Sequence, residues 1–303
     1  MTRPVFSRPG LRLTTGHSPQ RRRAMAAILG VGLAGTLALA GCSQGASPAP
    51  KSVVAAALPG EHVHGISRDP GSGKVNLATH EGLFVLQSDA SWQKVGPTVD
   101  LMSFAITGPG TFYASGHPAE GVDLPAPVGL IKSTDAGRTW TVMSLGGQSD
   151  FHALTASSTA VTGFDSVLRT TTDGKSWSQG GLSVEPSSLA AAPDGSQVLA
   201  TTGQGLFSST DAGATWVPLA SAPPLLLTAW ADSKTVVGVT SQGGLVVSED
   251  AGSSWKKGAA TLTSAEAVCA SRDKAGLLEI LVATDKGVVQ SRDDGATVTV
   301  LTS

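Results

Sequence analysis

An eight-residue phrase recurs along the chain at a nearly constant interval, and this repeat constrains the fold more than any other feature. Full or near copies are "STDAGRTW", "TTDGKSW", "STDAGATW" and "SEDAGSSW", while "SRDDGATV" lacks the tryptophan and "SDASW" is shortened. The copies end at Trp92, Trp140, Trp177, Trp216, Trp255 and Val298, which are 48, 37, 39, 39 and 43 residues apart. A period of about 40 residues is typical of propellers and solenoids.

Each copy follows the same order of short β segments. "LATTGQGLFSSTD" and "LVATDKGVVQSRD" both contain an apolar run, a polar turn with glycine, a second apolar run and then the acidic phrase. Another pair of apolar runs lies upstream, so each period predicts four strands, with the phrase between the third and the fourth. Six such units predict an all-β, six-bladed β-propeller over residues 59–303. Residues 52–58 are a candidate for an additional strand that closes the ring.

The phrase resembles the Asp-box, or BNR repeat, S/T-x-D-x-G-x-T/S-W, found in sialidases and in many propellers that are not enzymes. The resemblance implies that the phrase is a folding device on the edge away from the active site. In such a turn the aspartate accepts backbone N–H bonds, the glycine adopts a positive φ and the tryptophan packs beside the sheet. The expected structural positions are Asp135, Gly137, Trp140, Asp173, Trp177, Asp211, Gly213, Trp216, Asp250, Gly252, Trp255, Asp293 and Gly295.

Residues 1–41 predict a lipoprotein signal peptide that does not belong to the fold. Three arginines at 21–23 precede an apolar run that ends at Ala40 and is short for a transmembrane helix. The tetrapeptide "LAGC" resembles the bacterial lipobox, which implies that Cys42 is acylated and becomes the first residue of the mature chain. Residues 42–58 then form a flexible tether. We expect a protein that is anchored to the cell membrane by lipid on its extracytoplasmic side.

The charge and cysteine content argue against two classes of protein. Without residues 1–41 the chain keeps 15 Lys and Arg against 23 Asp and Glu, a net charge of −8. Because an acidic surface repels phosphate backbones, nucleic acid is not an expected partner. Cys269 is then the one cysteine besides Cys42, which rules out a disulfide framework and predicts a buried thiol.

Five histidines remain after the signal peptide, and all map to the face of the predicted propeller opposite the repeated phrase. Neutral imidazoles beside carboxylates bind Zn²⁺ or Cu²⁺, and imidazole also serves as a general acid or base. The alternative is that each ring satisfies only local hydrogen bonds at a strand end. The candidate ligand or metal-binding residues are His62, His64, His80, His117, His152 and Asp150.

The second repeat is nine residues longer than the common spacing of 39, and the excess falls in "GHPAEGVDLPAPVGL", residues 116–130. A proline-rich insertion over the histidine-bearing face predicts a lid or a specificity loop. It is expected to bring Glu120 and Asp123 beside the imidazoles.

Sialidase chemistry is not expected from these residues. It needs a tyrosine nucleophile, which the lone Tyr113 within a strand does not suit, and a clamp of three arginines, for which no arginine is suitably placed. Another glycosidase mechanism needs two carboxylates, for which the candidates are Glu81, Glu120 and Asp123. The pattern "EHVHGI…ATHEGLF…ASGHP" resembles bacterial BNR-repeat lipoproteins labelled as glycosyl hydrolases, a label that follows from the propeller resemblance.

Two hypotheses of function therefore remain open. The first is a ligand-binding or scaffolding module for an unknown small-molecule, glycan or protein ligand, with a Zn or Cu ion as its candidate cofactor. The second is a glycoside hydrolase of unknown sugar specificity. Neither requires a nucleotide, haem or flavin, for which the mature chain carries no motif.

Overall fold

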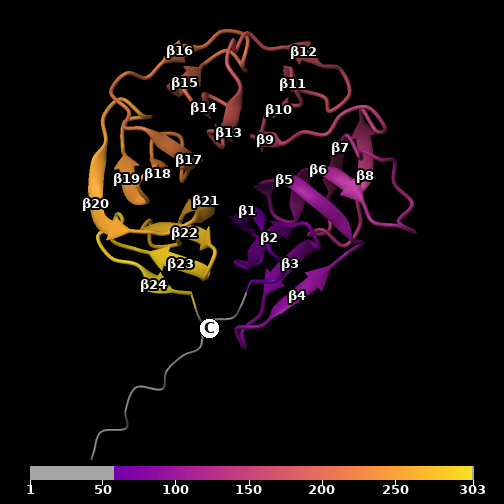
Figure 1. Cartoon of the computed structure of the whole chain (residues 1–303), viewed down its shortest axis with the longest axis horizontal. Helices are drawn as coiled ribbons and strands as arrows, with labels where there is room; N and C mark the ends of the chain where they lie inside the picture. Colours follow the sequence, from indigo (N-terminus) through magenta and orange to yellow (C-terminus); the bar gives the residue numbers. More distant parts are fainter. Residues whose placement is uncertain (1–57, 302–303) are drawn as a thin grey trace, which may run out of the picture. The chain divides into compact units, whose positions relative to one another are not determined.

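The computed structural model describes residues 58–301 and shows six antiparallel sheets of four strands each (Figure 1). The sheets follow one another along the chain, and we number them as blades 1 to 6. Blade 1 consists of β1 (Val63–Arg68), β2 (Val75–Thr79), β3 (Gly82–Leu86) and β4 (Trp92–Val95). Blade 2 consists of β5 (Val99–Gly108), β6 (Thr111–Pro118), β7 (Leu130–Ser133) and β8 (Thr141–Ser144). Blade 3 consists of β9 (Ala153–Ala156), β10 (Val161–Phe164), β11 (Leu168–Thr171) and β12 (Ser178–Gln179).

The other half of the ring repeats this arrangement. Blade 4 consists of β13 (Pro186–Ala191), β14 (Val198–Thr202), β15 (Gly205–Ser209) and β16 (Val217–Pro218). Blade 5 consists of β17 (Leu225–Trp230), β18 (Val236–Thr240), β19 (Gly244–Ser248) and β20 (Lys256–Thr261). Blade 6 consists of β21 (Ala265–Arg272), β22 (Leu278–Thr284), β23 (Gly287–Ser291) and β24 (Thr299–Val300). The prediction of an all-β, six-bladed β-propeller is confirmed.

The first strand of every blade lies on the inside of the ring. Neighbouring first strands approach one another with Cα atoms within 8 Å, from β1 through β5, β9, β13 and β17 to β21, and β21 returns to β1. Figure 1 shows these six strands around the centre of the molecule. They surround a central channel that contains two cavities, one toward each end.

The hydrophobic core is divided into six apolar clusters, and each cluster lies between two neighbouring blades. The cluster between blades 4 and 5, for example, joins Leu199 and Leu206 to Val236 and Val246, and Trp255 packs against it. Each repeated phrase thus ends in a side chain that packs against the cluster between its own blade and the preceding one. The equivalent side chains are Trp92, Trp140, Trp177, Trp216 and, in blade 6, Val298.

Every repeated phrase forms the turn between the third and the fourth strand of its blade. In blade 2, Oδ1 of Asp135 accepts the backbone N–H of Thr139 at 2.9 Å, and Oδ2 accepts the Thr139 hydroxyl at 2.7 Å. Gly137 has φ +83° and donates its N–H to the hydroxyl of Ser133. We call this unit the aspartate turn. The same bonds recur around Asp211, Asp250 and Asp293, and a shorter form around Asp173.

The aspartate turns are expected to lose stability in acid. The hydroxyl and the backbone N–H of Thr215 donate to Asp211, and they lower the pKa of this carboxyl from 3.8 to about 2. A carboxylate whose pKa is lower in the folded than in the unfolded state stabilises the fold above its unfolded pKa, and this contribution is lost as pH falls through the folded pKa. The contribution of Asp211 is therefore complete above pH 3.8 and disappears as pH falls toward about 2.

Urea unfolding midpoints measured from about pH 5 to about pH 2 test this expectation. Asp211→Asn should decline less steeply with falling pH than the unsubstituted protein, because the titrating group is gone. Glu61→Gln, which replaces an exposed carboxylate, should follow the unsubstituted protein. An Asp211→Asn protein that declines as steeply would show that the turn carboxylate does not contribute.

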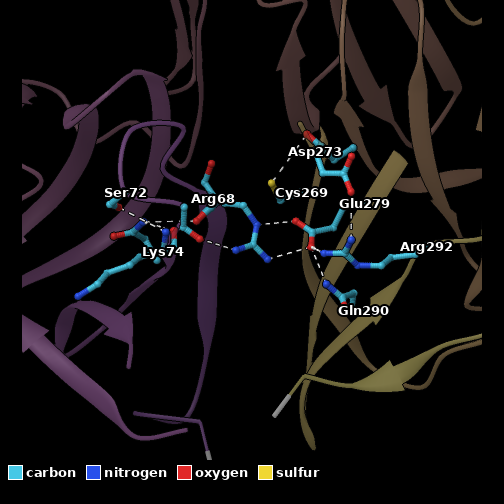
Figure 2. A network of polar contacts seen from close by, with 12 residues as sticks. Arg68, Ser72, Lys74, Cys269, Asp273, Glu279, Gln290 and Arg292 are labelled. Atoms are coloured by element: carbon cyan, nitrogen blue, oxygen red, sulfur yellow. Dashed lines mark hydrogen bonds and ion pairs between the residues drawn. The ribbon is translucent and has the colours of Figure 1, made fainter. Parts of the chain in front are cut away.

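The seam between blade 6 and blade 1 is joined by side chains, since within residues 58–301 no strand is exchanged between these sheets. An apolar cluster joins Val63 and Leu77 of blade 1 to Leu281 of blade 6. Beside it lies the network of Figure 2, in which both Nε and Nη2 of Arg68 donate to the carboxylate of Glu279, at 2.5 and 2.9 Å. A bidentate arginine–carboxylate pair has a fixed geometry and is among the stronger polar contacts in proteins.

Glu279 is the centre of that network. Its side chain is only 3% exposed, and Oε1 also accepts hydrogen bonds from Arg292 and Gln290. The bond to Arg68 spans 211 residues of sequence. Of the closing strand expected at 52–58, only Leu58 lies within the described residues, where it packs against the same apolar cluster without being part of a strand.

Two further expectations from the sequence concern the N-terminus. The signal peptide and Cys42 lie outside the described residues, as does the tether except for Leu58. Within residues 58–301, no helix has the length and apolar character needed to cross a bilayer.

Candidate functional site

The turns of the propeller fall into two sets at opposite ends of the central channel. The aspartate turns and the turns between first and second strands lie at one end. The turns between second and third strands, and the connections between blades, lie at the other. A cavity of about 240 Å³ at this second end is lined by His64 and His152, so we call it the histidine end.

A β-bulge marks the beginning of the first strand in each blade. In blade 1 the register shifts between Val63 and Gly65, which leaves His64 as the extra residue. Equivalent shifts occur in blades 2, 4, 5 and 6. In blade 3, Phe164 pairs with Ala153 and its carbonyl also accepts the N–H of His152, so that two residues of one segment face a single residue of the next strand. Bulges redirect side chains at the rims of sheets. The six bulge residues, here called the mouth ring, are His64, Met102, His152, Ser187, Leu226 and Glu266, and all but Leu226 line the cavity.

Two residues further along each first strand, a second ring narrows the channel. Its members line both the cavity at the histidine end and the cavity at the other end. They are Ile66, Phe104, Leu154, Leu189, Thr228 and Val268. Since five of the six are apolar, most of the polar side chains that line the cavity belong to the mouth ring.

Three imidazoles and a carboxylate form the histidine–aspartate cluster on this rim: His62, His64, His80 and Asp100. Nε2 of His64 lies 3.2 Å from Nε2 of His80, and Nδ1 of His80 lies 2.8 Å from Oδ1 of Asp100. The ring of His62 stands edge-on to that of His80, with centroids 5.8 Å apart. The bond between His80 and Asp100 crosses from blade 1 to blade 2. Ligand atoms from His64, His80 and Asp100 all lie within 4.8 Å of one another, which is close enough to surround a metal ion.

Burial and hydrogen bonding determine which imidazole lone pairs this cluster presents. Burial lowers the pKa of His64 below its ordinary value, and the nearby His80 lowers it further. Because a carboxylate accepts the hydrogen bond at Nδ1 of His80, the proton of the neutral ring lies on Nδ1 and the lone pair on Nε2. That lone pair faces Nε2 of His64. Either an N–H of His64 or a cation can satisfy it.

Glu266 of blade 6 completes the rim beside this cluster. Its Oε2 accepts the backbone N–H of Val63 at 2.8 Å, and its Oε1 lies 3.9 Å from Nδ1 of His62. It is the one carboxylate among the described residues that lines the cavity at the histidine end.

The other two histidines form a second group around Asp150. Nε2 of His152 lies 3.3 Å and Nε2 of His117 lies 3.8 Å from Oδ2 of Asp150, while Oδ1 is buried without a hydrogen-bond partner. The strand registers make His117 equivalent to His80 and Asp150 equivalent to Asp100. The same pairing of a histidine with an aspartate of the next blade therefore occurs twice, but only the first group brings three ligand atoms within 4.8 Å.

Comparison with known proteins finds no family model and no curated protein that matches the sequence. Among solved structures, a GH74 enzyme of Niastella koreensis is similar at a TM-score of 0.52 and 13% identity, over 80% of this chain and 54% of the enzyme. The chain thus spans about half the length of that enzyme. YCF48 bound to D1 peptide is similar at a TM-score of 0.50 and 15% identity, over 80% of this chain and 83% of YCF48. These similarities show the propeller fold alone.

The carboxylates expected to serve a glycosidase are not gathered at the cavity. Glu81, Glu120 and Asp123 are exposed, and none of them lines it. Among residues 58–301, neither Glu120 nor Asp123 forms a hydrogen bond or an ion pair with an imidazole. Their placement beside the histidines therefore stays a prediction. The insertion packs on the propeller through Leu124, which contacts the apolar cluster between blades 1 and 2, and the N–H of Val128 donates to the carbonyl of Gly116.

Sequence reasoning treated the five histidines as one set, whereas the structure divides them into two groups. It also missed three residues of the rim: Asp100, Met102 and Glu266. When the six first strands are aligned on their common bulge position, Met102 and Glu266 occupy the same position as His64, and Asp100 occupies the same position as His62. The repeat therefore contains these equivalences, but the β-bulge needed to align the strands correctly is visible only in the structure.

Proposed function

We propose that this chain is a membrane-anchored, extracytoplasmic binding module that holds a transition-metal ion in the histidine–aspartate cluster. The observation that carries the proposal is the pair of Nε2 atoms of His64 and His80, 3.2 Å apart, with Asp100 behind His80. In a tetrahedral Zn²⁺ site with metal–nitrogen bonds of about 2.0–2.1 Å, two nitrogen ligands lie about 3.3 Å apart. The two rings are thus spaced as neighbouring ligands of one ion.

The partner of His80 supports the same conclusion. A histidine that binds a metal usually donates its other ring N–H to a carboxylate, which fixes the tautomer and makes the ligand more basic. Asp100 accepts such a bond from His80. Imidazole ligands suit Zn²⁺ and Cu²⁺, and the exposed ring of His62 can approach the same ion.

Anchorage to the membrane through lipid on Cys42 is part of this proposal and rests on the sequence around that cysteine. A binding role also suits the fold, since YCF48, a protein with a similar propeller, is found bound to D1 peptide. The glycosidase hypothesis has less support, because Glu266 is the one carboxylate that lines the cavity among residues 58–301.

Calorimetric titration of the purified protein with ZnCl₂ and with CuCl₂ tests the ion site. We expect a single ion to bind, and we expect His64→Ala to abolish binding because one of the paired lone pairs is lost. Asp100→Asn should weaken the affinity by about 10–100-fold, the usual cost of removing the partner of a histidine ligand.

Asp150→Asn is the matched control for this titration. It changes the equivalent aspartate of the second histidine group and should leave the affinity of the first unchanged. Binding no tighter than about 1 mM would contradict the proposal. So would equal effects of Asp100→Asn and Asp150→Asn.

A further inference from the structure

Met102 occupies the mouth ring next to His64. Both residues line the cavity at the histidine end, and the strands that carry them, β1 and β5, have Cα atoms within 8 Å of each other. Methionine and histidine side chains are long enough to meet across two strands that lie this close together. Met102 lies at the bulge of β5, where the register shifts between Leu101 and Ser103.

The strand that carries Met102 is already tied to the proposed ion site. Asp100 precedes Met102 by two residues on β5 and accepts the hydrogen bond from His80. This bond fixes the start of β5 against blade 1. The same strand therefore supplies the carboxylate behind His80 and a thioether at the rim of the cavity.

The ordinary role of a buried methionine is to fill gaps in the core, and Met102 does not have that role. It is partly buried but is absent from all six apolar clusters. Met143, in contrast, packs against the cluster of blades 2 and 3. Of the four methionines in the sequence, these two alone lie in the described residues. One is thus used in the core, while the other is presented to the mouth of the channel.

We infer that the thioether of Met102 is a ligand of the ion held by His64 and His80, and that the site prefers Cu⁺ to Zn²⁺. The inference rests on the proposed ion site and names its metal and a further ligand. Thioether sulfur is a soft donor that selects Cu⁺, whereas Zn²⁺ is served by imidazole, carboxylate and thiolate. Cu⁺ enters and leaves without a change of oxidation state, so the proposal includes no redox step.

The test is an anaerobic competition titration of the purified protein with Cu⁺ against the chromogenic chelator bicinchoninate. We expect Met102→Leu, which conserves volume and apolar character, to lower the Cu⁺ affinity at least about tenfold. The Zn²⁺ affinity of the same variant should stay within about twofold of the unsubstituted protein, because Zn²⁺ does not use the thioether. Met143→Leu is the matched control and should change neither affinity.

X-ray absorption of the copper-loaded protein gives a second readout. A sulfur scatterer in the first shell is expected in the unsubstituted protein and in Met143→Leu, and it should be lost in Met102→Leu. A thermal unfolding scan of each variant confirms that a loss of affinity does not come from a loss of fold.

The outcomes separate this inference from the proposed function. If Met102→Leu keeps its Cu⁺ affinity and copper shows no sulfur neighbour, the inference is overturned, while loss of Zn²⁺ binding in His64→Ala still supports the ion site. If the unsubstituted protein binds neither ion, both proposals fail. If Met102→Leu weakens Cu⁺ and Zn²⁺ equally, the preference for Cu⁺ is disproved.

Discussion

Glu279→Ala is expected to lower the free energy of unfolding by about 3–5 kcal/mol, the usual cost of breaking a buried ion pair by removing one partner. The carboxylate of Glu279 accepts hydrogen bonds from Arg68, Arg292 and Gln290 while its side chain is 3% exposed. Its loss leaves Arg68, whose side chain is 26% exposed, without a counter-charge at the seam of blades 6 and 1. Urea unfolding followed by tryptophan fluorescence measures the change.

Asp232→Asn is the control for that experiment, because the amide oxygen can keep the hydrogen bonds that Oδ1 of Asp232 accepts from the backbone of Lys234 and Thr235. Asp232 accepts a hydrogen bond from Arg272 across the seam of blades 5 and 6, so the substitution breaks an equivalent contact between arginine and carboxylate. This pair is 37% and 35% exposed, and an exposed pair contributes about 0–1 kcal/mol. A loss for Asp232→Asn as large as that for Glu279→Ala would show that burial and the additional partners of Glu279 are not the cause.

Gly116→Ala is expected to cost about 2–6 kcal/mol, from backbone strain of about 1–3 and a forced displacement of about the same size. Gly116 has φ +145°, and an added Cβ would lie 1.8 Å from the carbonyl oxygen of Asp100 and 3.0 Å from the nitrogen of Met102. The bulge on β5 brings these backbone atoms that close. The substitution should therefore also weaken ion binding, because it moves the segment that holds Asp100 and Met102.

Gly203→Ala tests whether the loss of stability in Gly116→Ala comes from the close approach at the β5 bulge and not simply from the replacement of a glycine. Gly203 lies in the turn between β14 and β15, and an added Cβ would meet nothing within 4 Å. A surface substitution of this kind changes stability by no more than about 0.5 kcal/mol. If Gly116→Ala is equally mild, the close approach at the bulge does not constrain the site.

The blades could be predicted from the sequence because the aspartate turn is a local structure. Ser209, Asp211, Gly213 and Thr215 bond with one another within seven residues, so their spacing alone marks the turn wherever it occurs. Trp216 follows at once and packs toward the preceding blade. Local bonds and a fixed period are visible in a sequence without any knowledge of the tertiary structure.

The seam and the rim could not be predicted, since they depend on contacts between distant segments. The partners Arg68 and Glu279 are 211 residues apart, and neither stands out from other charged residues in the chain. The pairing of His80 with Asp100 depends on how two neighbouring blades are staggered. The histidines were predicted to share a face because their positions within the repeat place all of them at the same end of the blades, but their division into two groups follows from that stagger.

The mouth ring has a consequence for how the chemistry of the channel can be altered. The backbone bends in the same way whether the position holds the imidazole of His64, the thioether of Met102, the hydroxyl of Ser187 or the branched chain of Leu226. The β-bulge therefore does not depend on which side chain occupies its extra position. A substitution at one of these positions can therefore change the chemistry at the mouth of the channel one blade at a time while the β-bulge stays in place.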